Sequence, residues 1–416
     1  MFRSLRNHNY RLFASGGVVS NTGTWMQRTA QDFLVLQLTG GSAFALGITT
    51  ALQFLPQFLF GMYGGVLADR YPKRRLLVAA QSLMGLFALV MGLLALTGEA
   101  RVWHVYALAF LLGTVSCIEV PTRQSFVVEM VGRGDLANAI ALNSSSFNLA
   151  RVVGPALAGM LIYALGGTGP IFVVNALSFG AVIASLVFMR RSELRTPEPV
   201  PRAKGQLREG LRYVLGERAL LMPILLIAFQ SMFTQGFTIS IPVMATEVFG
   251  AGASAFGIAS SAFAVGALGG ALLAARRAQP TRRLLIGGAV ALGVAQIVTA
   301  FAPGYLVYLV LLVPAGIALI TVNNAANAIV QLTTTPEMRG RVMSIYILML
   351  TCGAPLGAPL IGWVSELGGP RVGVMIAGVM SLVGTGLAIL VTNAVVRRRN
   401  ADAVVRGVAA AAGVAR

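Results

Sequence analysis

The chain has 416 residues, of which 56% are hydrophobic and only 11% are charged, whereas an ordinary soluble domain carries about 25% charged residues. Its net charge of +18 comes from short basic clusters between long apolar runs. A nucleic-acid partner would require basic residues gathered on one folded face, so this pattern argues against one. The composition therefore predicts an all-α integral membrane protein.

The residues that carry enzyme or metal chemistry are scarce. Cys117 and Cys352 lie in apolar stretches and are too few for a disulfide framework or a four-ligand zinc site. The two lysines lie outside any GxxxxGK[ST] phosphate cradle, which excludes an ATP-driven pump. His8 and His104 fall near opposite membrane faces. We therefore expect no metal, no cofactor and no enzyme activity.

A bilayer core of about 30 Å requires roughly 20 apolar residues as a helix. Twelve stretches meet this requirement, near residues 12–36, 43–66, 77–97, 103–121, 138–163, 169–189, 220–243, 253–275, 284–302, 305–327, 342–364 and 372–394. With these spans, 28 of the 32 Lys and Arg residues fall on one side of the membrane. Cytoplasmic loops carry the basic excess, so both termini are predicted to be cytoplasmic.

The first predicted helix carries ionisable residues inside the membrane. Asn21, Trp25, Arg28 and Asp32 follow 4-3-4 spacing and share one helix face at about 100° per residue. Gln27 and Gln31 lie beside this stripe. A charged face cannot look at lipid, so it is expected to line a central cavity. Arg28 and Asp32 also have the spacing of a self-neutralised ion pair, which would only order the helix.

The junction after the second helix reads Gly65-Val-Leu-Ala-Asp-Arg-Tyr-Pro-Lys-Arg-Arg75. Gly65, with Gly61 four residues earlier, allows close helix approach. Asp69 is expected to accept hydrogen bonds from neighbouring helix ends or to pair with an arginine. Arg70 and Arg74 supply cytoplasmic charge, and a purely topogenic basic loop is the alternative interpretation.

Helices four and five supply further charges. Glu119 precedes Arg123 by one turn in the order that favours an ion pair; it is either a proton carrier or a capping pair. Arg151 lies about 20 Å along helix five at ~1.5 Å per residue, with no acid in its own helix, so Asp32 or Glu119 is expected to be its partner. Asn143 and Asn148 accompany it, and Gly154-Pro155 predicts a kink that suits a gate or plain packing.

A polar segment divides the chain into domains: 1–189, a linker at 190–218, 219–396 and a disordered tail at 397–416. The linker contains Glu198-Pro-Val-Pro-Arg202 and then a short amphipathic pattern, which predicts a helix along the membrane surface. The second half offers neutral hydrogen-bonding groups that serve either a ligand or helix packing: Gln230, Thr234, Gln235, Asn323, Asn324 and Asn327. Aromatic candidates for an amphipathic ligand are Phe54, Phe58, Phe233 and Phe237.

Three segments recur in the same order in both halves, at offsets of 203 to 210 residues. They are Leu46-Gly-Ile-Thr-Thr50 with Phe256-Gly-Ile-Ala-Ser260, Gly64-Gly65 with Gly269-Gly270, and Gly154-Pro-Ala-Leu-Ala-Gly159 with Gly357-Ala-Pro-Leu-Ile-Gly362. Duplicated helical halves are the usual construction of secondary transporters.

These features together resemble the major facilitator superfamily, whose cytoplasmic-loop signature matches Gly65 to Arg75. Pro121-Thr-Arg-Gln-Ser-Phe126 and Phe147-Asn-Leu-Ala-Arg-Val-Val-Gly-Pro155 resemble its bacterial branch of enterobactin exporters and macrolide efflux proteins. The resemblance implies a twelve-helix fold in two halves, a conformational latch at Gly65, Asp69, Arg70 and Arg74, and an antiporter-type motif at Gly154 and Pro155. The second copy of the latch has Leu273-Ala-Ala275 where an acid is expected.

The resemblance predicts a monomeric transporter of the bacterial inner membrane that exports a small amphipathic compound, such as a drug or siderophore, in exchange for protons. Asp32, Glu119 and Arg151 are the candidates for proton coupling. Candidates for the substrate cavity are Asn21, Trp25, Arg28, Gln31, Asn148, Gln230, Gln235 and Asn327. The alternatives are a facilitator or importer of a metabolite, and a non-transporting receptor, scramblase or assembly factor.

Overall fold

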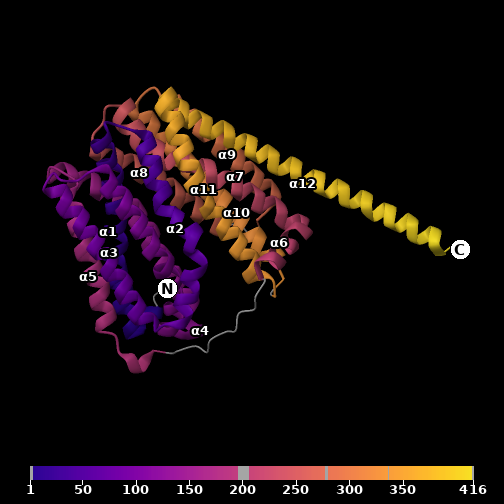
Figure 1. The fold of residues 1–416 in the computed structure, drawn as a ribbon, viewed down its shortest axis with the longest axis horizontal. Helices are drawn as coiled ribbons and strands as arrows, with labels where there is room; N and C mark the ends of the chain where they lie inside the picture. The colour runs from indigo at the N-terminus through magenta and orange to yellow at the C-terminus, as the bar shows by residue number, and fades with distance from the viewer. Residues whose placement is uncertain (1–2, 195–205, 277–279, 336, 415–416) are drawn as a thin grey trace.

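The computed structural model describes residues 3–194, 206–276, 280–335 and 337–414, and this part of the chain is helical with no strand. The first half contains α1 (His8–Thr39), α2 (Ala43–Arg70), α3 (Lys73–Leu96), α4 (Val102–Ala164) and α5 (Gly169–Val187). The second half contains α7 (Arg218–Val243), α8 (Ala253–Ala275), α9 (Arg282–Ala300), α10 (Tyr305–Thr333), α11 (Arg339–Gly368) and α12 (Pro370–Val414). Figure 1 shows the two halves side by side.

Helix α4 is two membrane helices joined by a sharp bend. Gly132 has φ +67°, a conformation that glycine adopts without steric cost, and it separates the spans Val102–Gly132 and Gly134–Ala164. The sequence predicted a longer connection between 121 and 138. The helices instead continue beyond the apolar stretch, because the polar residues there extend a helix as well as they form a loop.

The described residues thus form twelve long helices, six in each half, as the sequence predicted. Eleven of them are long and apolar enough to cross a membrane by length and composition alone. Helix α1 is the twelfth. It has 32 residues, but Arg28 and Asp32 and their polar neighbours lower its hydropathy, so tertiary packing rather than composition identifies it as a span.

The segments outside the helical halves differ from expectation in one place. Helix α6 (Gln206–Gly216) forms where the amphipathic pattern predicted it, and Arg341 Nη1 of α11 lies 2.5 Å from Glu209 Oε1. The Glu198 to Arg202 segment lies outside the described residues. The backbone of 397–414 continues α12 as a helix, whereas the sequence predicted disorder. This tail is rich in alanine, which has the highest helix propensity of the amino acids.

The two halves contact each other at one end, which we call the closed end, and diverge toward the other, the open end (Figure 1). One buried apolar cluster at the closed end combines both halves, including Val35, Leu46 and Ala158 with Val243 and Ile361. At the open end each half has its own cluster, around Phe126 in the first half and around Tyr346 in the second. The core therefore joins the halves at the closed end only.

The closed end is built from the duplicated segments. A Cβ on Gly47 would lie 2.5 Å from the carbonyl oxygen of Ala358, and one on Gly257 would lie 2.3 Å from that of Pro155. In the reciprocal direction, a Cβ on Gly362 or Gly159 would lie 2.5 Å from the carbonyl oxygen of Ala43 or Ala253, respectively. These contacts are equivalent under the repeat offsets. The pairs α2–α11 and α4–α8 are therefore related by the internal duplication.

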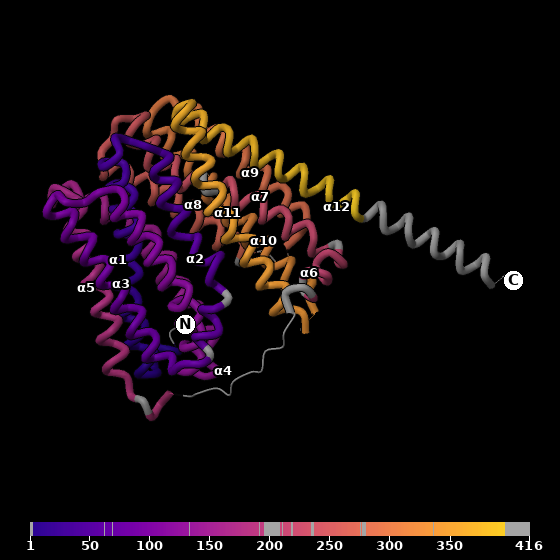
Figure 2. The backbone as a smooth tube through the Cα atoms, in the orientation of Figure 1, coloured from indigo at the N-terminus to yellow at the C-terminus, as the bar shows by residue number. Residues whose placement is uncertain are grey.

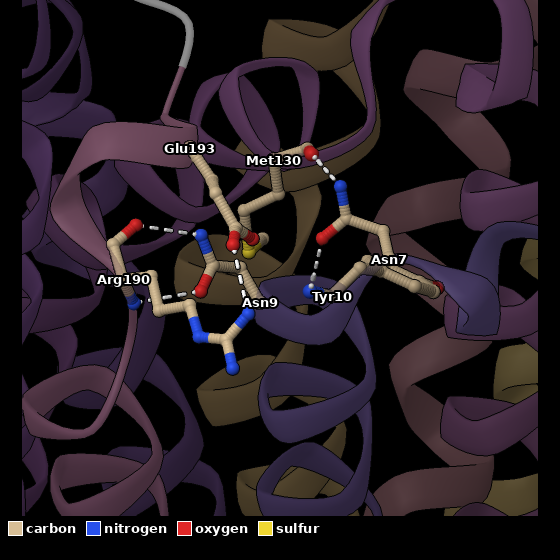
Figure 3. A network of polar contacts seen from close by, with 6 residues as sticks. All are labelled: Asn7, Asn9, Tyr10, Met130, Arg190 and Glu193. Atoms are coloured by element: carbon tan, nitrogen blue, oxygen red, sulfur yellow. Dashed lines mark hydrogen bonds and ion pairs between the residues drawn. The ribbon is translucent and has the colours of Figure 1, made fainter.

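The first half is tied together at the open end by a polar network (Figure 3). The Asn7 side chain accepts from Tyr10 N and donates to Met130 O at 2.6 Å. Asn9 donates to Arg190 O and accepts from Arg190 N, both at 2.9 Å. These bonds join the start of α1 to α4 and to the segment after α5. Figure 2 shows α5 beside α1 and α3 in this half.

Candidate functional site

A cavity lies between the two halves, on the open side of the closed-end contacts. It consists of two adjoining hollows of about 290 and 250 Å³, which together fall in the usual range for ligand pockets. Both are lined by Phe54, Arg151, Phe237, Thr238 and Phe263. The walls thus combine aromatic side chains from α2, α7 and α8 with a cation from α4.

Three of the four residues in the α1 stripe line this cavity, namely Trp25, Arg28 and Asp32. The fourth, Asn21, donates to Ser146 Oγ of α4 at 3.3 Å and is not part of the lining. Asn21 lies about three turns nearer the open end than Asp32, so it meets the neighbouring helix before the cavity begins.

The glutamines beside the stripe lie off the cavity. Gln31 is buried and is absent from the lining, which differs from the prediction. Gln27 Oε1 accepts from Asn175 Nδ2 of α5 at 2.6 Å. A glutamine one residue before the stripe points about 100° away from it, and α5 covers that direction.

The two arginines converge on one indole ring. The Cζ atoms of Arg28 and Arg151 lie 4.9 and 5.9 Å from the centroid of Trp25, within the range of cation–π interactions. Among the described residues, neither guanidinium lies within 4.0 Å of a carboxylate. The self-neutralised Arg28–Asp32 ion pair, which the spacing allowed as an alternative, is therefore not formed; Arg28 lies over the Trp25 ring instead.

Asp32 is the carboxylate of the cavity. Neither hollow is lined by another acidic residue of the described chain, and its oxygens have no hydrogen-bond or ion-pair partner among the described residues. Arg28 is its charged neighbour and also acts electrostatically on Arg151. One carboxylate and two guanidiniums thus face an otherwise neutral space, whose lining mixes aromatic, aliphatic and hydroxyl side chains.

Glu119 lies elsewhere in the first half. Its Oε1 atom is 2.9 Å from Arg123 Nε and accepts from Gln81 Nε2 of α3 at 3.3 Å. The side chain is buried and does not line the cavity. Arg151 is therefore not paired with Glu119, because Arg123 of the same helix occupies that carboxylate.

The polar candidates of the second half have different surroundings. Gln230 is buried, accepts from Ser381 Oγ at 2.8 Å and donates to Thr385 Oγ1 at 3.1 Å, so it faces α12 instead of the cavity. Asn327 accepts from Gln331 of its own helix. Asn323, one turn earlier on α10, lines the cavity. The side chains of Thr234 and Gln235 lie outside the described residues.

Sequence reasoning both found and missed aromatic residues of the lining. Phe54 and Phe237 line the cavity, whereas Phe58 is exposed and Phe233 is buried in the core. Phe256 and Phe263 of α8 were missed. Phe256 begins the repeated Phe256 to Ser260 segment, and Phe263 follows that segment as Phe54 follows its counterpart in α2. This repeat is the signal that would have found both residues.

The polar and motif residues in the second span of α4, Gly134–Ala164, have separate contacts. Asn148 donates to Ser144 O of its own helix at 2.9 Å and does not line the cavity. Pro155 lines it. A Cβ on Gly154 would lie 2.6 Å from the Cβ of Trp25, so this glycine gives the tryptophan its place beside α4.

The latch region at the open end is held inside the first half. Lys73 Nζ lies 2.6 Å from Glu129 Oε1 of α4, a pair that sequence reasoning missed. Arg74 donates to Leu186 O and Val187 O at 2.5 and 2.8 Å, which satisfies carbonyls at the end of α5. Arg70 is exposed, and the side chain of Asp69 lies outside the described residues.

The close helix approach in this region falls on Gly64, where a Cβ would meet Cys117 O of α4 at 1.9 Å. The sequence placed this approach at Gly65 and Gly61. A Cβ on Gly61 would meet only Gln57 of its own helix. One residue changes the helix face by about 100°, so sequence alone could not choose between neighbouring glycines.

Comparison with known proteins agrees with this architecture. Macrolide efflux protein A of Streptococcus pyogenes is 26% identical over 88% of this chain and 90% of its own length. Multidrug efflux pump Tap of Mycobacterium tuberculosis strain H37Rv is 27% identical over 90% and 91%. In shape, the chain resembles an inward-facing, unoccupied bacterial homologue of the human lysosomal transporter Spinster, with a TM-score of 0.71, 15% identity and coverage of 94% and 98%.

A POT family transporter in complex with 5-aminolevulinic acid gives a TM-score of 0.72 at 12% identity, covering 93% of this chain and 96% of the other. The sequence profile of the family described as transmembrane secretion effector matches residues 1–408. Because the match spans nearly the whole chain and the fold agrees, this multi-pass membrane protein belongs to the transmembrane secretion effectors of the major facilitator superfamily.

Proposed function

We propose that this protein exports a small amphipathic compound by alternating access, in exchange for protons that bind Asp32. The observation that carries the proposal is the Asp32 carboxylate, which has no hydrogen-bond or ion-pair partner among the described residues and faces a cavity between two duplicated halves. The macrolide and multidrug efflux relatives support export of a drug-like compound. The chain encloses the cavity by itself, which supports a monomer as the working unit.

The basic residues support the orientation. The open end carries Arg3, Arg74 and Arg341, and a basic excess is typical of the cytoplasmic side. We therefore assign the open end and both termini to the cytoplasm of a bacterial inner membrane. A compound would then enter the cavity from the cytoplasm or the adjacent lipid leaflet while the closed end separates it from the outside.

Exchange follows when proton and substrate compete for one group. A substrate that hydrogen-bonds to the ionised Asp32, or pairs with it, excludes a proton there, and the protonated acid releases the substrate. Coupling requires that the two ligands favour different arrangements of the halves. The present arrangement of the halves, with the closed end shut, is one of the two. It is held by the reciprocal glycine contacts of Gly47, Gly159, Gly257 and Gly362. The latch contacts of Lys73 and Arg74 would stabilise the first half as a rigid unit during the change.

The test is transport in inverted membrane vesicles with an imposed pH gradient, using a macrolide and a cationic dye as probes. Asp32→Asn is expected to lower gradient-driven accumulation by about tenfold or more, in the usual range of coupling energies. Glu119→Gln is the matched control, because that carboxylate is buried outside the cavity. Unchanged accumulation in Asp32→Asn would exclude Asp32 from coupling, and gradient-independent flux in the wild type would instead identify a facilitator.

A further inference from the structure

We infer that Trp25 is a positioning residue whose indole ring holds the two cavity arginines and so leaves the Asp32 carboxylate unpaired. This inference rests on the proposed proton exchange at Asp32 and adds a residue to it. Ring and carboxylate compete for the same guanidinium, that of Arg28. Which of them holds Arg28 decides how readily Asp32 takes up a proton.

The competition follows from position on α1. Arg28 lies three residues after Trp25 and four before Asp32, so its side chain reaches either neighbour on the same face. Its Cζ atom lies 4.9 Å from the ring centroid, and no carboxylate oxygen of the described residues lies within 4.0 Å. Arg151 approaches the same ring from α4, at 5.9 Å. The ring therefore holds both cations, although an acid is available one turn away.

Packing fixes the ring in this place. Trp25 makes an edge contact with Phe147 of α4, with centroids 5.6 Å apart and planes at 67°. Its Nε1 atom is buried and has no acceptor among the described residues, so shape and not hydrogen bonding positions the indole. Gly154 makes the fit possible, because a Cβ there would lie 2.6 Å from the Trp25 Cβ. The Gly154-Pro155 motif thus acts on the cavity through Trp25 as well as through Pro155, which lines it.

The other elements around the cavity add no competing charge. Helix α2 contributes Thr50, Gln53 and Phe54, α7 contributes Thr238, and α8 contributes Ser260, all neutral. The charged groups of the described lining are Arg28, Asp32 and Arg151. The protonation of Asp32 therefore depends on where these two arginines lie, which the ring controls.

The experiment measures Asp32 protonation directly. Infrared difference spectra across a pH series, recorded on the reconstituted full chain, give the band of the protonated carboxyl, which Asp32→Asn identifies. In Trp25→Leu the freed Arg28 pairs with Asp32, and a guanidinium favours the ionised carboxylate. We expect the protonation midpoint to fall by about one pH unit, which is about tenfold weaker proton binding. Trp25→Phe keeps an aromatic face and is expected to stay near the wild-type midpoint.

Glycine variants provide the matched comparison. Gly154→Ala displaces Trp25 and is expected to lower the midpoint, whereas a Cβ on Gly180 of α5 would meet no atom within 4 Å, so Gly180→Ala should leave the midpoint unchanged. An unchanged or raised midpoint in Trp25→Leu, or no band that Asp32→Asn removes, would overturn the inference. The spectra require neither substrate nor a gradient, so a failure of the proposed exchange in vesicles is a separate result.

Discussion

At the scale of single residues, a buried glutamine serves the same purpose in each of the two halves. Gln27 and Gln230 are both buried, and each bonds to the last helix of its half, through Asn175 in α5 and through Ser381 and Thr385 in α12. These glutamines join helices within a half, where an unsatisfied amide in an apolar medium would be costly.

Gln230→Ala is therefore expected to weaken the fold and leave the cavity intact. Loss of its hydrogen bonds to α12 should cost about 1 kcal/mol, typical of interhelical bonds in membranes, and lower the thermal unfolding midpoint. Probe efflux at permissive temperature should match the wild type. If the variant instead had normal stability and an altered affinity for the probe, the prediction would be wrong and Gln230 would contact the substrate.

At the scale of elements, the closed end depends on helix pairs that approach to backbone contact. On α2 the approach to Ala358 of α11 requires glycine at position 47, since a Cβ would lie 2.5 Å from a carbonyl oxygen and 3.0 Å from the Cα of Pro359. Backbone atoms cannot yield as a flexible side chain does. Any larger residue must separate the helices, and so the halves.

Gly47→Ala is expected to shift the population toward a form that is open at the now closed end. The matched control is Gly180→Ala in α5, where a Cβ would meet no atom within 4 Å. Spin-label distances across the closed end, measured on the purified protein, should lengthen in Gly47→Ala only. Equal distance distributions in both variants would show that the close approach does not hold this end shut.

At the scale of the whole molecule, orientation is the property that the basic residues predict. Glu99 lies at the closed end and Glu337 at the open end, and both are exposed. In a background with Cys117 and Cys352 replaced by alanine, a membrane-impermeant maleimide on intact cells should label Glu99→Cys and not Glu337→Cys. Permeabilised cells should show both labelled. The reverse pattern on intact cells would place the termini outside.

The number of helices, the division into two halves, the duplication and the family could all be read from the amino-acid sequence alone. These follow from apolar length, from the spacing of basic clusters and from repeated segments, all of which are local or statistical properties of the chain. The sequence also identified Trp25, Arg28, Asp32 and Arg151 as polar or charged groups buried among apolar residues.

Which of these groups contact one another could not be predicted and depends on how the helices pack. Helical periodicity gives the face on which a side chain lies but not the helix opposite that face. Packing therefore directed Gln230 to α12, gave Glu119 to Arg123, and brought Arg151 to the Trp25 ring. Packing also explains why the Trp25 ring and not Asp32 holds Arg28. The indole fits into space left by Gly154 of α4, which is 129 positions away along the chain.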